Sequence, residues 1–274
     1  DLHIQAFRIA EQLSLPVMVC MDGFILTHAY ERIDIPEQAQ VDRYLPPYEP
    51  RQVLDPSEPV TIGAMVGPEA FTEVRYLAHA KQLQALDLLP ELAKEFKEVF
   101  GRDSGGLVKP YKLDDAETIV IALGSVLGTI KDTVDEMREQ GVKIGVLGIT
   151  SFRPFPIEAI RAVTAHAKRI VVIEKCFAVG IGGIVSRDVR SAVQSRPQQV
   201  FAVVAGLGGR AITKASLHKM LQQAIADQLE LLTFLDLDWG IVNRVLEREK
   251  LQRRSGPVAE GILRDIGTVS SKIA

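Results

Sequence analysis

The chain has 274 residues, of which 47% are hydrophobic and 24% are charged, as in ordinary globular proteins. This length suits one large domain or two ordinary ones. The formal net charge is −3, and nucleic-acid backbones are bound by clustered Lys and Arg, so the composition argues against a nucleic-acid partner.

The cysteine and histidine content predicts neither disulfides nor a metal site. Cys20 and Cys176 lie in or beside apolar runs, where a thiol is usually a small buried hydrophobic group. Two thiols cannot supply the four ligands of an ordinary iron–sulfur cluster, and so few cysteines fit a cytoplasmic location. The five histidines show no metal-ligand spacing. No apolar run reaches membrane-spanning length and no signal peptide opens the chain, so we expect no membrane association.

Residues 1–32 are interpreted as the end of a domain. Asp1–Leu13 predicts an amphipathic helix, with Leu2, Ile9 and Leu13 on an apolar stripe. Val17–Met21 is an apolar run that predicts a strand. One helix and one strand cannot bury both faces of a layer, and the chain starts at Asp1 rather than at Met. We therefore expect a fragment or a trimmed chain, in which this stripe and strand are unstable unless another domain or a partner covers them.

Residues 33–114 predict a connector and a helix. Prolines recur between Ile33 and Pro68, which favours an extended segment over a helix or a central strand, because proline lacks an N–H donor and fixes φ. Phe71–Phe100 predicts a helix with a break at Pro90, and Gly101–Pro110 a second linker.

Residues 115–226 alternate apolar runs with helical patterns. Strands are expected at 118–123, 142–149, 170–173 and 200–204, and helices at 130–140, 157–168, 184–193 and 213–226. Apolar strands that alternate with helices predict an α/β domain with an open, mainly parallel sheet and helices on both faces. Residues 227–274 form a tail that contains the single tryptophan, Trp239.

Three glycine-rich turns follow strands of this domain, at 124–128, 180–183 and 206–210. Such turns can hold phosphate on helix amides. However, none completes the dinucleotide fingerprint, and the second strand runs into Thr150 rather than into an acid. Tight turns need glycine with or without a ligand, so a structural role is favoured.

Five residues are candidates for a cleft or an interface, and no catalytic residue is identified. Asp22, Gly23 and His28 follow the expected strand at 17–21, where Asp22 and His28 could point into a cleft, although Asp-Gly is also a common turn. Glu174 ends a strand at the sheet edge where ligands usually bind, although a salt bridge or a subunit contact is favoured for it. Arg153 lies in a Pro-rich turn and could face a partner.

Several of these stretches together resemble the pyruvate (2-oxoacid):ferredoxin oxidoreductases. PVMVCMDGFILTHAYE is similar to the last strand of that family's pyrimidine-binding domain, and the proline-rich connector is similar to the stretch that follows it. ALGSVLGT, FRPFP, RIVVIEKC, GIGGIVSRDV and GLGGRAITK resemble successive turns of its second domain, which is like the C-terminal domain of transketolase. The resemblance covers about the first 225 residues in order. It implies the C-terminal part of an alpha-type subunit, with domain boundaries at 1–32, 33–114, 115–226 and 227–274.

The resemblance implies an enzyme that decarboxylates pyruvate or a related 2-oxoacid, captures the acyl group on coenzyme A and reduces ferredoxin or flavodoxin. It implies thiamine diphosphate with magnesium and iron–sulfur clusters in the whole complex, with none on this chain alone. The implied partners are a diphosphate-binding beta subunit, an acyl-acceptor gamma subunit and a ferredoxin-like delta subunit, in a homo- or hetero-oligomer. This chain would supply a scaffold and subunit-interface domain.

Two alternatives stay open at the level of sequence. One is a transketolase-like enzyme or a 2-oxoacid dehydrogenase component, although those relatives lack the connector. The other is an assembly module without catalysis.

Overall fold

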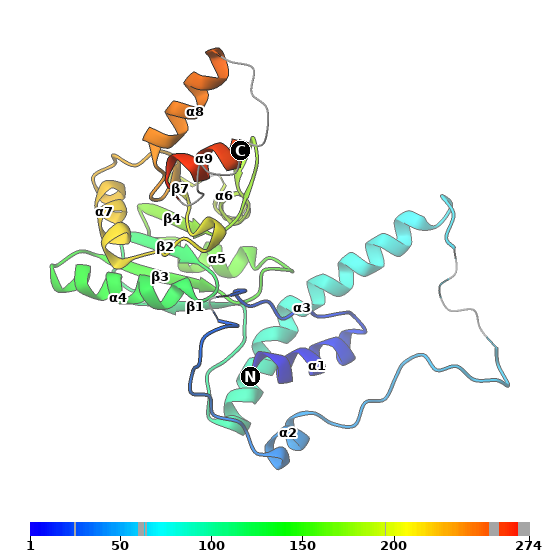
Figure 1. Cartoon of the computed structure of the whole chain (residues 1–274). Helices are drawn as coiled ribbons and strands as arrows, with labels where there is room; N and C mark the ends of the chain where they lie inside the picture. The colour runs from blue at the N-terminus through cyan, green and yellow to red at the C-terminus, as the bar shows by residue number, and fades with distance from the viewer. Residues whose placement is uncertain (25, 60–62, 64, 195, 252–257, 268–274) are drawn as a thin grey trace. The chain divides into compact units, whose positions relative to one another are not determined.

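The structure is a computed structural model that describes all residues except 25, 60–62, 64, 195, 252–257 and 268–274. The chain divides into two units, Asp1–Thr233 and Phe234–Ala274. The larger unit holds the sheet and the candidate residues (Figure 1).

A six-stranded sheet forms the centre of the larger unit, in the order β1-β3-β2-β4-β7-β8. The strands are β1 (Val108–Tyr111), β2 (Thr118–Ala122), β3 (Ile144–Ile149), β4 (Arg169–Glu174), β7 (Gln199–Val204) and β8 (Leu232–Phe234). Strands β3, β2, β4 and β7 run parallel, and β1 is antiparallel to β3 at one edge. A separate two-stranded ribbon joins β5 (Phe177–Ala178) to β6 (Gly182–Gly183).

Helices cover both faces of the sheet, as the apolar strands predict. On one side pack α5 (Ile157–Val163) and α6 (Val185–Val193), and on the other α4 (Val126–Glu139) and α7 (Lys214–Ile225). Ile119, Ile121 and Val172 belong to a core shared with α5 and α6. Successive strand residues point to opposite faces, so the buried Val120 and Val171 face α4 and α7. The predicted α/β class with an open, mainly parallel sheet is confirmed.

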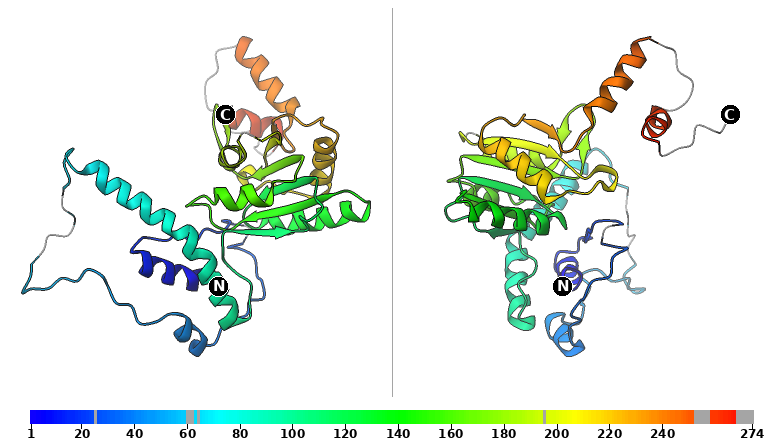
Figure 2. Two further views of the ribbon diagram at one scale, coloured as in Figure 1. Left: turned by 180° about the vertical axis from the view of Figure 1, so that it is seen from behind. Right: turned by 60° about the vertical axis from the view of Figure 1, so that its left-hand side comes forward.

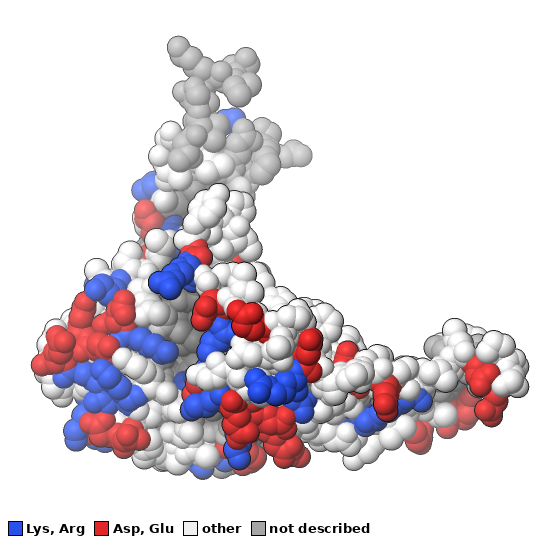
Figure 3. All heavy atoms as spheres, turned by 90° about the horizontal axis from the view of Figure 1, so that it is seen from below, with Lys and Arg blue, Asp and Glu red and all other residues white. Residues whose placement is uncertain are grey.

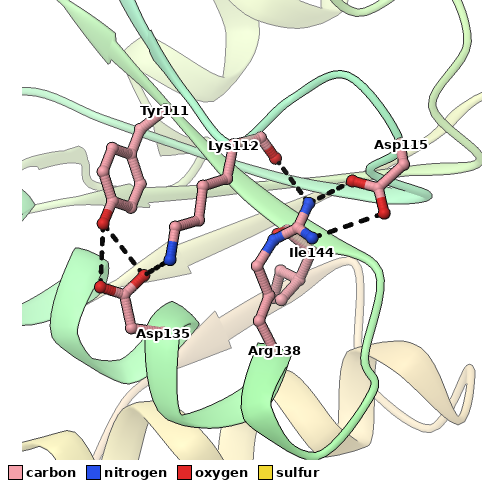
Figure 4. A network of polar contacts seen from close by, with 6 residues as sticks. All are labelled: Tyr111, Lys112, Asp115, Asp135, Arg138 and Ile144. Carbon is pink, nitrogen blue, oxygen red and sulfur yellow. Dashed lines mark hydrogen bonds and ion pairs between the residues drawn. The ribbon is translucent and has the colours of Figure 1, made fainter.

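Strand β1 lies where the sequence predicts a linker. Its partner is β3, with Lys109 opposite Gly148. A polar network then joins the end of β1 to α4 (Figure 4). Asp135 accepts hydrogen bonds from the Tyr111 hydroxyl at 2.8 Å and the Lys112 ammonium at 2.6 Å. Arg138 donates to the carbonyls of Lys112 and Ile144 at 2.9 and 2.7 Å and pairs with Asp115. The prediction of a linker over Gly101–Pro110 was therefore wrong for residues 108–110.

The N-terminal helix is covered, contrary to expectation. Helix α1 (Leu2–Leu13) lies beside α3 (Phe71–Phe100), as Figures 1 and 2 both show. Ile9 and Leu13 are buried there with Ala85 and Leu92, whereas Leu2 is 42% exposed. Val17–Met21 forms no strand, and most of its side chains are exposed. Among the described residues, no strand lies beside it to form the ladder that a strand requires.

The connector is not entirely extended. Gln38–Tyr44 forms the helix α2, which fits between Pro36 and Pro46. Tyr44 is buried at its end, donates to the carbonyl of Leu92 at 3.0 Å and lies 4.7 Å beneath the guanidinium of Arg8. The pKa of the Tyr44 phenol is raised to about 12, mainly by burial. The charge of Arg8 lowers this pKa and the charge of Glu95 raises it further. Tyr44 thus ties α2 to α1 and α3.

Pro90 does not break α3, which continues through it. The half of α3 that contains Pro90 packs on α1 and Tyr44, and this packing offsets the backbone hydrogen bond that proline removes.

The smaller unit holds α8 (Trp239–Leu251) and α9 (Val258–Asp265), which are joined by an ion pair between Arg248 and Asp265 at 2.8 Å. The end of the predicted tail lies outside the described residues.

Candidate functional site

The edge of the sheet at the carboxyl ends of β2 and β4 is the position in this fold where a ligand is expected. After β2 the chain turns to α4 on one face, and after β4 it turns to α6 on the other. The connections diverge at this point of the strand order, and open α/β sheets usually bind ligands at such a switch. Gly124 and Ser125 follow β2, and Lys175 follows β4.

Asp22 lies at this edge of the sheet. One oxygen of its carboxylate accepts the backbone N–H of Ser125 at 2.8 Å, and the other lies 3.0 Å from the ammonium of Lys175. Gly124 has a φ of 83°, and a Cβ added there would lie 3.2 Å from Asp22 Oδ2. The glycine therefore serves both the turn and the close approach of the carboxylate. The sequence offered Asp22 as a candidate for a cleft or an interface but did not indicate Ser125 or Lys175 as its partners.

The pKa of Asp22 reflects this setting. Partial burial alone would raise the pKa, but the hydrogen bonds from Ser125 and Lys175, together with the charge of Lys175, outweigh burial and lower it. Asp22 is therefore an internal anion at the amino end of α4, the kind of position that also attracts phosphate groups.

Glu174 is a buried cap for α6. Its side chain is 4% exposed, and it accepts backbone N–H groups from Ile184 and Val185 at 2.7 Å and from Ser186 at 3.1 Å. A Cβ added to Gly183 would lie 1.9 Å from Glu174 Oε1, so only glycine fits. The described residues thus give Glu174 helix amides as partners in place of the salt bridge that the sequence favoured.

Cys176 lies beside this cap. Its Sγ is 3.8 Å from Glu174 Oε2. Partial burial, followed by the charge and hydrogen bond of Glu174, raises the pKa of the thiol, which disfavours the thiolate. Both cysteines are free and exposed, so the expected burial of Cys20 and Cys176 was wrong.

Arg153 is held within the chain. Its guanidinium donates to Asp188 on α6 at 2.8 Å and lies 4.1 Å from the ring centre of Phe152. The side chain is 54% exposed, so it keeps an open face as well.

Gly23 and His28 lie in an exposed turn after Asp22. The Phe24 N–H donates to the Thr27 hydroxyl at 2.8 Å, and that hydroxyl lies 3.2 Å from His28 Nδ1. The rings of Phe24 and His28 are 4.7 Å apart. These contacts are local, and His28 takes part in the turn. Of the five candidate residues, Asp22 and Glu174 lie at the edge of the sheet where the strands end.

The described residues gather no metal ligands, and the first glycine turn does not fit a diphosphate. Nowhere outside the masked positions do three or more His, Cys, Asp or Glu side chains gather as metal ligands. The amide of the first glycine turn already binds the Asp22 carboxylate, which would repel a diphosphate. We therefore derive no reaction step from a cofactor on these residues.

Two family models match the chain in order. Residues 1–94 match the model described as "Pyruvate flavodoxin/ferredoxin oxidoreductase, thiamine diP-bdg". Residues 116–217 match "Pyruvate:ferredoxin oxidoreductase core domain II". Among the described residues, no helix is long and apolar enough to cross a membrane.

Relatives of known sequence agree with these matches. The pyruvate synthase subunit PorA of Methanosarcina barkeri is 43% identical over 228 residues, which cover 81% of this chain and 57% of that subunit. The ketoisovalerate oxidoreductase subunit VorA of Pyrococcus abyssi is 32% identical over 257 residues, which cover 92% of this chain and 62% of that subunit. A 2-oxoglutarate:ferredoxin oxidoreductase from Magnetococcus marinus is similar in structure, with 16% identity and a TM-score of 0.47 over 65% of this chain and 29% of that one.

The fold and the two matched domains define the class, which is the thiamine-dependent oxidoreductases. Within that class the two matched domains assign the chain to the pyruvate (2-oxoacid):ferredoxin oxidoreductase family, and it is similar to the PorA and VorA subunits. It spans a little over half the length of the curated relatives that it matches.

Proposed function

We propose that the chain is a component of a 2-oxoacid:ferredoxin oxidoreductase. The whole assembly would decarboxylate a 2-oxoacid oxidatively, transfer the acyl group to coenzyme A and pass the electrons to ferredoxin or flavodoxin. The observation that carries this proposal is the match of two domains of one family, in chain order, over residues 1–94 and 116–217. Pyruvate is the favoured substrate, because identity is 43% to a pyruvate synthase subunit and 32% to a ketoisovalerate oxidoreductase subunit.

This chain would act as a scaffold and subunit-interface domain rather than as a catalyst by itself. The Asp22 carboxylate binds the Ser125 amide and the Lys175 ammonium at the sheet edge, which supports the proposal that thiamine diphosphate, magnesium and the iron–sulfur clusters are held elsewhere in the assembly. Holding cofactor-binding domains in register is a contribution to catalysis, since it fixes the reacting groups before reaction. The residues proposed for a cleft or an interface are Asp22, Gly23, His28, Arg153 and Glu174.

The proposed partners are the diphosphate-binding, acyl-acceptor and ferredoxin-like subunits. Acidic and basic side chains alternate over the face in Figure 3, which does not favour a nucleic-acid partner. The free thiols Cys20 and Cys176 fit a reducing cytoplasm. The division at 1–32, 33–114, 115–226 and 227–274 is kept as a proposal for the domain boundaries.

A titration of the isolated chain with thiamine diphosphate and magnesium tests the scaffold role. We expect no saturable binding by calorimetry, because a carboxylate occupies the candidate anion position. Tight, magnesium-dependent binding of one equivalent would contradict the proposal. The variant Asp22→Asn should be titrated in the same way. Weak binding of thiamine diphosphate that appears only in this variant would show that the cofactor binds at the first glycine turn.

A further inference from the structure

Residues 16–33 form a strap between two attached ends. Before the strap, Leu15 packs on the cluster that α1 and α3 share, and after it Arg102 donates to the carbonyl of Asp34 at 2.7 Å. Of the described residues of the strap, all except Val19 and Asp22 are exposed. Among them, Asp22 alone forms a hydrogen bond or an ion pair with the rest of the described chain. Polar contacts therefore hold the strap on the sheet at one residue.

The two partners of Asp22 belong to two neighbouring strands. Its carboxylate accepts the Ser125 N–H at 2.8 Å and lies 3.0 Å from the Lys175 ammonium. Ser125 follows β2 and Lys175 follows β4, and these strands pair with each other in the sheet, so the two partners stay at a fixed separation. Two contacts with such a frame fix both the position and the direction of the carboxylate, whereas one contact would leave it free to turn.

This contact is better protected from water than an ordinary surface ion pair. The side chains of Asp22 and Lys175 are 18% and 30% exposed. Partly buried charges are screened less by salt, and hydrogen bonds to charged groups are stronger than those between neutral groups. The contact of Asp22 is therefore suited to hold a strap whose other described side chains are almost all exposed.

The contact also joins the two stretches that match the family. Asp22 lies within residues 1–94, which match the thiamine-binding model, whereas Ser125 and Lys175 lie within residues 116–217, which match core domain II. We propose that Asp22 is a positioning residue, which anchors the strap of the first stretch on core domain II. Its part in the reaction rests on the function proposed above. Groups that are aligned before reaction lower the barrier, and an anchored strap would preserve that alignment.

The chain carries its own labelling sites for a test of the anchor. Cys20 lies two residues before Asp22, Cys176 directly follows Lys175, and both thiols are free and exposed. Nitroxide labels on these two thiols of the full chain report the distance between strap and sheet by electron paramagnetic resonance. The wild type should give one narrow distance distribution. In Asp22→Ala the distribution should be roughly twice as broad or more, because the strap then moves as a loop with few contacts.

Three further variants separate the anchor from a general disturbance. Lys175→Met removes the charge partner and should broaden the distribution, whereas Lys175→Arg keeps the charge and should preserve most of the narrow distribution. Glu31→Gln is the matched control, since Glu31 is an exposed acid of the same strap, and it should behave as the wild type does. Circular dichroism of each variant verifies that the sheet and helices are retained.

The part in the reaction is measured in the native assembly. Asp22→Ala should lower kcat for 2-oxoacid-dependent reduction of ferredoxin, per assembled enzyme, by roughly tenfold or more. The KM for the 2-oxoacid should stay within about twofold, because the described partners of Asp22 are groups of its own chain rather than substrate. Lys175→Arg should retain most of the rate. A residue that only stabilises the fold would lower the yield of assembled enzyme and leave its kcat unchanged.

The two measurements fail in different ways. A distance distribution that is as narrow in Asp22→Ala as in the wild type would overturn the anchor. A broadened distribution together with an unchanged kcat would overturn the positioning role. A wild-type assembly that oxidises no 2-oxoacid would overturn the proposed function and the positioning role with it, and the resonance measurement would then decide the anchor alone.

Discussion

At the scale of single residues, the sequence singled out Asp22 and Glu174 as candidates but did not indicate their partners. Asp22 was placed near a cleft because it follows an apolar run, and Glu174 because it ends a strand. Apart from the Lys175 ammonium, their partners in these contacts are backbone amides of Ser125 and of residues 184–186, and an amide has no signature in the sequence. The glycines beside these amides were the available signal, since Gly124 and Gly183 leave room for the carboxylates.

The contact of Asp22 predicts a specific dependence on pH. Its pKa in the folded chain is lowered, so the contact contributes fully above the ordinary pKa of an aspartate, about 3.9, and is lost as the pH falls through the lowered value. The amide resonance of Ser125, followed by NMR, should therefore titrate with a midpoint below about 3.9. Asp22→Asn should abolish that titration and cost about 1 kcal/mol of stability.

Asp87→Asn is the matched control for this prediction, because Asp87 is an exposed aspartate on α3. It should leave the titration of Ser125 unchanged. A midpoint at or above the ordinary aspartate value in the wild type would show that the carboxylate is not stabilised in its charged form by the turn.

At the scale of elements, periodicity predicted the centre of the sheet well and its borders poorly. Strands β2, β3, β4 and β7 are buried apolar runs, and each was predicted within a few residues. Strand β1 contains Lys109 and Pro110 and pairs on one side only, so its sequence looks like a linker. Conversely, Val17–Met21 has the composition of a strand, but pairing depends on neighbours rather than on composition. The sequence did not predict helix α2 because prolines flank it. Helix α3 continues through Pro90 because its tertiary packing outweighs the low helix propensity of proline.

The cap of α6 can be tested by a pair of glycine substitutions. Gly183→Ala would place a methyl group 1.9 Å from Glu174 Oε1, so the carboxylate must leave the amides of α6 or the backbone must shift. We expect a loss of about 2–4 kcal/mol in the free energy of unfolding, measured by chemical denaturation. Gly128→Ala, within α4, meets nothing within 4 Å and should stabilise by up to about 1 kcal/mol. Equal effects of the two substitutions would contradict the role assigned to Glu174.

At the scale of the whole molecule, the class of fold followed from the alternation of strands and helices, whereas the function did not. At the switch point the Ser125 amide is bound by a carboxylate of the same chain, and the contacts there identify no substrate. The assignment to a family rests instead on two domains that match in chain order. It is supported by relatives, of whose length this chain spans a little over half.

The central claim is that this chain works within a 2-oxoacid:ferredoxin oxidoreductase, and an assay of the native assembly tests it most directly. The assembly should be purified through a tag on this chain and supplied with coenzyme A and ferredoxin. We expect pyruvate-dependent reduction of ferredoxin with formation of acetyl-CoA, at a higher rate than with 2-oxoglutarate or a branched 2-oxoacid. An intact assembly that oxidises none of these 2-oxoacids and contains neither thiamine diphosphate nor iron–sulfur clusters would contradict the account.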